Sequence, residues 1–178
     1  PKSKKDELVL ELTKVNHDFL GFGKSFSGSC NLDVVCGEND GFELVENYRD
    51  IIKSVGAYHI NGTETCSGVL LNNTREDKTP YFLTANHCGI SQNNSASVVA
   101  YWNYENSVCR PPNSVESGLD GDGNLSQFNT GAIYRAGSNS SDFNLIEFDD
   151  PIRAEYSPFF AGWKNDFEST PIVIGNNP

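Results

Sequence analysis

The sequence contains no methionine, and no apolar run approaches the roughly 20 residues needed to span a bilayer, so no membrane partner is expected. Basic residues are few: 13 Lys and Arg stand against 24 Asp and Glu, which gives a net charge of −11. A chain this acidic repels a phosphate backbone, so nucleic-acid binding is not expected either. The first residues, Pro1–Glu7, are charged and lack the apolar run of a signal peptide. We infer that a leader was removed or that the chain is a fragment.

The sequence also lacks any Cys-x-x-Cys pair, which argues against a zinc ribbon or a thioredoxin-type redox site. Loops rich in Asn and Ser are typical of a secreted protein, in which four cysteines would form two disulfides. One cysteine of the five is then left over: Cys30, Cys36, Cys66, Cys88 and Cys109. Its partner lies in chain that is not present here, or it is a buried, inert thiol, and counting favours neither.

The remaining composition is that of a globular domain, with 178 residues of which 37% are hydrophobic and 21% charged. Short β-type segments recur between turn signals, and no long amphipathic helix is evident. Strands are expected at Glu7–Val15, Val55–Ile60, Cys66–Leu71, Tyr81–Ala85, Val98–Tyr104, Ala132–Arg135, Phe143–Phe148, Phe159–Trp163 and Ile172–Ile174. A helical turn is expected at Asn47–Ser54 and a polar loop at Pro111–Gly131. The pattern predicts an antiparallel barrel or sandwich.

One of the three histidines has the context of a catalytic base. His87 follows the apolar strand and immediately precedes Cys88, so a disulfide would hold it in one orientation. A general base needs such fixed geometry, because proton transfer works only at hydrogen-bond range. His17 and His59 lie in ordinary polar or strand contexts and are interpreted as structural.

Asp142 is the matching candidate for an orienting acid, because it enters an apolar strand where a carboxylate needs a partner. An Asx turn at the strand end is the alternative interpretation. No activated nucleophile can be assigned, since both Gly-x-Ser-x-Gly and Gly-Asp-Ser-Gly are absent.

The segment Asp120–Asn124 places potential calcium ligands at alternate positions, as in an EF-hand loop. The sixth place holds Leu125 instead of Gly and the twelfth holds Gly131 instead of Glu. We interpret the segment as a polar turn and predict no metal site.

Several blocks resemble the trypsin-like serine proteases of chymotrypsin fold, and the bacterial lysyl endopeptidases in particular. They cover most of the chain from about residue 25 and comprise Ser27–Cys36, Cys66–Leu71, Tyr81–Gly89, Val99–Arg110 and Ser141–Glu147. The resemblance implies an all-β fold: the first antiparallel Greek-key barrel of two, with the second barrel absent or incomplete. It divides the chain into residues 1–24, the end of a propeptide, and residues 25–178, the barrel with the start of the inter-barrel segment.

The resemblance also assigns roles to single residues. It makes His87 the general base and Asp142 its orienting partner, in a triad whose serine lies beyond Pro178. In place of the family's usual Ala before the histidine, this chain has Asn86, a small change.

For the cysteines, the family pattern pairs Cys66 with Cys88 and Cys36 with Cys109. Cys30 would pair with a cysteine of the second barrel and so is unpaired in this chain. That assignment agrees with the odd count of cysteines.

The expected function is therefore that of a secreted serine endopeptidase that cuts after lysine without a cofactor. Its partners would be a protein or peptide substrate and the missing C-terminal barrel of the same chain. The preference for lysine is implied by overall similarity alone. A non-catalytic extracellular half-protease module that binds a protein or glycan is the alternative.

The Gly- and Ser-rich joint before Cys30 predicts a processing site. Mature enzymes of the resembling family begin at about this place, after a lysine, so we expect cleavage of the Lys24–Ser25 bond. N-terminal sequencing of the secreted natural protein should find a start at Ser25. A start well upstream would instead mean that the segment is retained as an edge strand.

Overall fold

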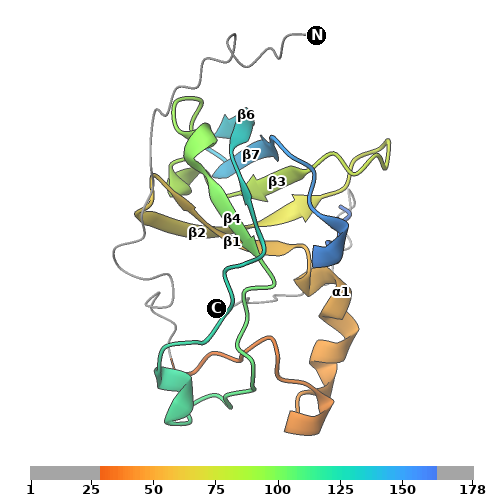
Figure 1. The fold of residues 1–178 in the computed structure, drawn as a ribbon, viewed down its shortest axis with the longest axis vertical. Coiled ribbons are helices and arrows are strands. Elements are labelled where there is room, and N and C mark those ends of the chain that lie inside the picture. The colour runs from red at the N-terminus through yellow and green to blue at the C-terminus, as the bar shows by residue number, and fades with distance from the viewer. Residues whose placement is uncertain (1–28, 164–178) are drawn as a thin grey trace, which may run out of the picture.

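Seven antiparallel strands form one sheet in the computed structural model, which describes residues 29–163 (Figure 1). The strands are β1 (Val55–Ile60), β2 (Glu64–Leu71), β3 (Tyr81–Thr84), β4 (Val99–Trp102), β5 (Phe128–Thr130), β6 (Ala132–Ser138) and β7 (Phe143–Phe148). Their order in the sheet is β5-β4-β1-β2-β3-β7-β6. In this order β4 lies beside β1, and β1 to β3 follow as hairpins, which is the Greek-key arrangement.

The sheet curls because its two ends are one residue apart in the chain. β5 and β6 lie at opposite ends of the strand order, yet only Gly131 separates them. Gly131 adopts a left-handed φ of 75°, its amide donates to the Val98 carbonyl at 2.9 Å, and its carbonyl accepts from the Asp149 amide at 3.2 Å. A flat sheet could not satisfy this connection, so the strands must wrap around a common core. The expected all-β antiparallel barrel fold is confirmed.

Large apolar and aromatic side chains fill the inside of the curl. Phe82 is at its centre: its ring lies edge-on to Tyr58 and Trp102 and packs at a tilt on Phe148. All four are almost completely buried. Burial of this kind supplies most of the free energy of folding, at about 25 cal/mol per Å² of apolar surface.

Most expected strands are present within a few residues of their predicted bounds, and two predictions were wrong. β5 lies inside the expected loop Pro111–Gly131, because its inward residue is the polar Asn129, whose Oδ1 accepts from Trp102 Nε1 at 2.9 Å. Phe159–Trp163 is not a strand and forms a single bridge between Ala161 and Leu71.

The helical turn expected at Asn47–Ser54 corresponds to a 3₁₀ segment, Glu43–Tyr48, and to α1 (Arg49–Ile52). The strands expected at Glu7–Val15 and Ile172–Ile174 lie outside the described residues. In the part of the chain that the structure describes, no helix has the length and apolar character to cross a membrane.

The segment before β1 is fastened to the loop after β4 by a disulfide and by a buried ion pair. Cys36 and Cys109 are bonded, with Cα atoms 4.6 Å apart. Beside them Arg110 donates to both carboxylate oxygens of Asp33, at 2.8 and 3.0 Å, and the side chains are 10% and 4% exposed. Burial acts to raise the pKa of Asp33, but the hydrogen bonds and the charge of Arg110 outweigh it and lower that pKa. Together the two links hold the segment before β1 against the loop after β4.

We predict that Arg110→Ala lowers the free energy of unfolding by about 3–5 kcal/mol, because it leaves the Asp33 carboxylate buried without its charged partner. Chemical denaturation followed by fluorescence measures the loss. Arg135→Ala is the matched control, since Arg135 pairs with Glu147 in an exposed setting and should cost at most about 1 kcal/mol. Equal losses in the two variants would refute this account of the buried pair.

Candidate active site

His87 lies in a short 3₁₀ turn, Asn86–Cys88, directly after β3. The turn ends at Gly89, whose left-handed φ of 81° allows its amide to donate back to the Asn86 carbonyl at 3.0 Å. The residue directly after His87, Cys88, is bonded to Cys66 of β2. On the N-terminal side of His87 the turn follows β3, which is paired with β2, so the histidine lies between a paired strand and a disulfide-bonded residue.

Asp142 occupies the last position before β7, at the end of the β6–β7 hairpin. Its backbone has a left-handed φ of 48°, a conformation that aspartate tolerates better than most residues. Its carbonyl accepts from the Asn86 amide at 3.2 Å. This local geometry turns the carboxylate toward the His87 turn.

The carboxylate of Asp142 makes two hydrogen bonds to His87. Oδ2 accepts from the imidazole Nδ1 at 2.7 Å, and Oδ1 accepts from the backbone amide at 2.9 Å. A carboxylate only accepts, so Nδ1 must carry the proton and Nε2 then holds the free lone pair. The two hydrogen bonds from His87 lower the pKa of Asp142, the side-chain bond having the larger effect.

The imidazole nitrogen Nε2 faces away from this bond and is open. The side chain of His87 is 72% exposed and that of Asp142 is 51% exposed. Among residues 29–163, the hydrogen bonds of His87 run from its amide and its Nδ1 to Asp142, and none joins Nε2 to Ser29 or Ser67. The arrangement can accept a proton at Nε2 from a group supplied by something outside the described residues.

The remaining sequence-predicted residues lie away from this pair or outside the described residues. The expected disulfides Cys66–Cys88 and Cys36–Cys109 are both formed, and Cys30 is free and exposed. Lys24 lies outside the described residues, so its processing stays a prediction.

Neither candidate metal group has the features of a metal site. Cys66, His87 and Cys88 lie close enough together to resemble a set of ligands, but the two sulfurs form a disulfide and offer no thiolate. In the calcium-like loop, the Asp122 carboxylate accepts from the amide and the hydroxyl of Ser107, which lowers the pKa of Asp122. These bonds support the interpretation of the loop as a polar turn.

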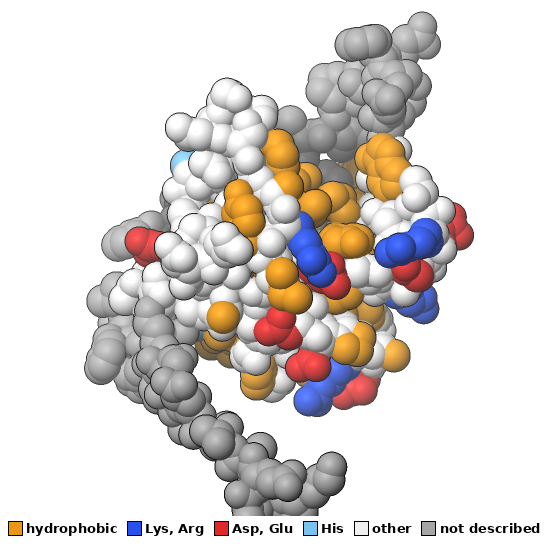
Figure 2. All heavy atoms as spheres, turned by 90° about the horizontal axis from the view of Figure 1, so that it is seen from above, with side chains coloured by type: hydrophobic (Ala, Val, Ile, Leu, Met, Phe, Trp, Pro, Cys, Tyr) orange, Lys and Arg blue, Asp and Glu red, His pale blue; other side chains and the backbone are white. Residues whose placement is uncertain are grey.

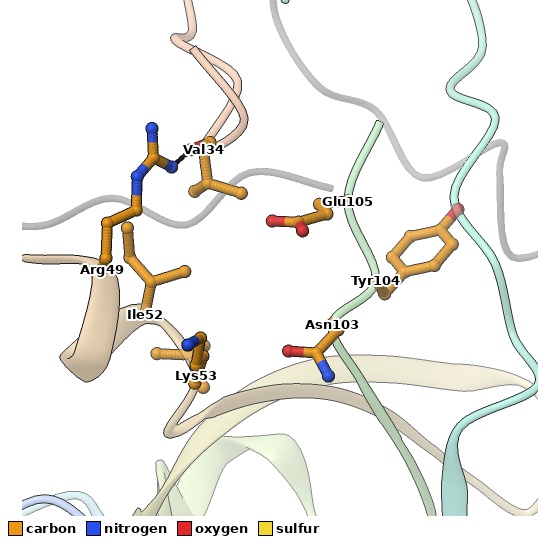
Figure 3. A pocket seen from close by; sticks show the side chains of 8 residues that line it. Val34, Arg49, Ile52, Lys53, Asn103, Tyr104 and Glu105 are labelled. Carbon is orange, nitrogen blue, oxygen red and sulfur yellow. Dashed lines mark hydrogen bonds between the residues drawn. The ribbon is translucent and has the colours of Figure 1, made fainter. Parts of the chain in front are cut away.

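A separate hollow lies where α1 meets the end of β4 (Figure 3). Half-burial raises the pKa of Glu105 there, although the nearby charges of Arg49 and Lys53 oppose the rise. Arg49 itself is engaged with the Cys36 carbonyl at 3.0 Å and with Glu46. The residues that line the hollow make no hydrogen bond or ion pair to His87 or Asp142. They are Val34, Arg49, Ile52, Lys53, Val55, Asn103, Tyr104 and Glu105 (Figure 3).

One polar residue near the pair was not singled out from the sequence. Asn144 is completely buried in β7, and its Nδ2 donates to the Ile90 carbonyl at 2.7 Å. Its signal was available, because it interrupts the inward-facing series that Ile146 and Phe148 continue.

Comparison with known proteins places the chain among protease-related domains. Residues 24–175 match the family described as "Lysyl endopeptidase, C-terminal domain", and the chain belongs to that family. A similar curated protein is the lysyl endopeptidase of Pseudomonas aeruginosa, 32% identical over 91 residues, or 50% of this chain. The match covers 19% of that relative's length. The resemblance drawn from the motifs is thereby confirmed.

The lowered pKa of Asp142 predicts a pH-dependent contribution to stability. A carboxylate whose pKa is lower when folded stabilises the protein above the ordinary aspartate pKa of about 3.9, and this contribution is lost as the pH falls through the folded-state value. The free energy of unfolding of Asp142→Asn should therefore lie below that of the wild type at pH 6, and the difference should shrink below about pH 4.

The same substitution in a His87→Ala background is the control. One of the two partners of the carboxylate is then absent, so the pH-dependent difference should be smaller. A difference that is unchanged by pH or by the background would contradict the assignment of the pair.

Proposed function

We propose that this chain supplies the general base and the orienting acid of a secreted serine endopeptidase that cuts peptide bonds after lysine. The observation that carries the proposal is the 2.7 Å hydrogen bond from His87 Nδ1 to Asp142, with Nε2 open, in a chain of the lysyl endopeptidase family. An imidazole with one nitrogen held by a carboxylate and the other exposed is arranged to accept a proton from an attacking hydroxyl.

In this proposal the nucleophile is a serine outside residues 1–178. Its oxygen bonds to the carbonyl carbon of the substrate while His87 Nε2 takes the hydroxyl proton. The imidazolium, stabilised by Asp142, then gives that proton to the leaving nitrogen as the C–N bond breaks. Water attacks the resulting ester in the same way, and the serine regains its proton. No cofactor is needed for any of these steps.

The substrate and the location are inferred from other features. The preference for lysine rests on the name of the family and of the Pseudomonas aeruginosa relative. Two disulfides support an oxidising compartment and hence secretion. The family match begins at residue 24, which supports residues 1–24 as the end of a propeptide and residues 25–178 as the protease barrel.

An apolar surface supports a further packing partner, which we propose to be the second barrel. Phe159 and Trp163 are 36% and 59% exposed, beside Ala161, which bridges to β2. Figure 2 shows one face of the molecule, on which apolar side chains are distributed among acidic and basic ones. Apolar surface of this kind is costly in water and marks a site for packing.

The proposal predicts that the 178-residue chain neither cleaves lysyl substrates nor reacts with a fluorophosphonate probe, since it holds a base and an acid without a nucleophile. A natural chain that extends through the serine-bearing segment should react. His87→Ala should abolish that reaction and lower kcat by about 10⁶-fold.

The matched control is His59→Gln, because His59 lies within β1 and hydrogen-bonds to Tyr101 instead of Asp142. That variant should keep its labelling. Stoichiometric labelling of the 178-residue chain that depends on His87 would overturn the assignment of an outside serine. An extended chain that never labels would favour the non-catalytic module.

A further inference from the structure

The His87–Asp142 pair is too exposed to hold its own geometry. Both side chains are more than half exposed, and hydrogen bonds between exposed charged groups compete with water and contribute little. The backbone pairing of β3 with β7, which brings the His87 turn and Asp142 together, ends at Thr84 opposite Asn144. This ladder therefore stops before it reaches His87 and Asp142. Beyond the ladder, the Asn86 amide donates to the Asp142 carbonyl at 3.2 Å on the N-terminal side of His87, so a further contact is needed on its C-terminal side.

Asn144 makes a contact with the required properties. It lies two residues after Asp142, its exposure is 0%, and its Nδ2 donates to the carbonyl of Ile90 at 2.7 Å. Ile90 lies three residues after His87 and is itself 4% exposed. The bond thus joins the two segments that carry the pair, and it does so where water does not compete.

The side-chain amide of Asn144 lowers the stability of the core at this position, so packing does not account for its presence. Asn144 shares the inward face of β7 with Ile146 and Phe148, where an apolar side chain would be expected. Its Oδ1 is buried and has no hydrogen-bond partner among the described residues. A buried acceptor without a partner destabilises the fold, so any favourable contribution of this amide comes from the hydrogen bond that its nitrogen makes.

We propose that Asn144 is a positioning residue, which holds the Ile90 carbonyl, and through it the His87 turn, at hydrogen-bond distance from Asp142. The side chain of Ile90 packs in the core, but that packing does not itself engage the Ile90 carbonyl. The bond from Asn144 restrains that carbonyl, and Gly89 and the Cys66–Cys88 disulfide transmit the restraint to His87. The importance of this role for catalysis rests on the proposed function, whereas the positioning itself does not.

The test uses the full 178-residue chain and needs no activity. Asn144→Leu replaces the amide with an apolar side chain of similar size and removes the donor to Ile90. The ¹³C resonance of the Asp142 carboxyl and the amide resonance of His87, followed by NMR from pH 2 to 7, report on the two bonds of the pair. In the variant, the pKa of Asp142 should rise toward the ordinary value of about 3.9, and the His87 amide should no longer follow its titration.

The matched control is Asn129→Leu. Asn129 is another buried asparagine, whose Nδ2 reaches the Asp150 carbonyl at 3.3 Å, and it lies on β5 instead of the β3–β7 pair. This variant should lose stability but keep the Asp142 titration of the wild type, which separates positioning from general destabilisation.

Wild-type titration of Asp142 in Asn144→Leu would overturn the proposal, whatever the stability of the variant. If the leucine variant does not fold, the Asp142 titration is measured in Asn144→Ser, which shortens the side chain without adding bulk. A wild-type titration in that variant would overturn the proposal in the same way. Failure of the proposed function would look different: His87→Ala in the extended chain would leave peptidase activity intact, while the titration still reported on the role of Asn144.

Discussion

The pairing of β3 with β7 is the interaction on which the candidate site depends. Residues 87 and 142 are 55 positions apart, and they meet because the Tyr81–Thr84 strand runs antiparallel to Phe143–Phe148 with Thr84 opposite Asn144. The register is set by the burial of Phe82 opposite Ile146 in the core. If β3 slipped by one residue along β7, Phe82 would leave the core face and His87 would lose its position opposite Asp142. Core packing and site geometry are therefore fixed together.

The site itself combines exposed chemistry with buried support. His87 and Asp142 are both exposed to solvent. Beneath them the Cys66–Cys88 disulfide and the Asn144–Ile90 hydrogen bond hold the turn. Where the segment before β1 meets the loop after β4, Asp33 and Arg110 form a buried ion pair beside the Cys36–Cys109 disulfide. Polar groups inside this small barrel thus serve to position its surface segments.

Much of this could be predicted from the sequence, because the signals are local. Short apolar and β-branched runs between turn signals predicted five of the strands nearly to their ends, and the His-Cys and Asp-Phe blocks pointed to the pair. β5 was missed because Asn129 is buried by a hydrogen bond to Trp102, a long-range contact that no local pattern reveals. Phe159–Trp163 looked like a strand because its aromatic residues are typical of one, although much of that surface is exposed. Asn144 visibly interrupts an apolar series in the sequence, but its partner Ile90 lies 54 positions away, so its role could not be predicted.

The central claim is that His87 is a base whose proton-accepting atom is Nε2. It is tested most directly by the tautomer of the neutral imidazole, read from the two ¹⁵N chemical shifts of His87 in the labelled chain. The bond from Nδ1 to Asp142 predicts a neutral ring protonated at Nδ1, with the lone pair on Nε2. In Asp142→Asn this preference should be lost. A wild-type ring protonated at Nε2 would contradict the account.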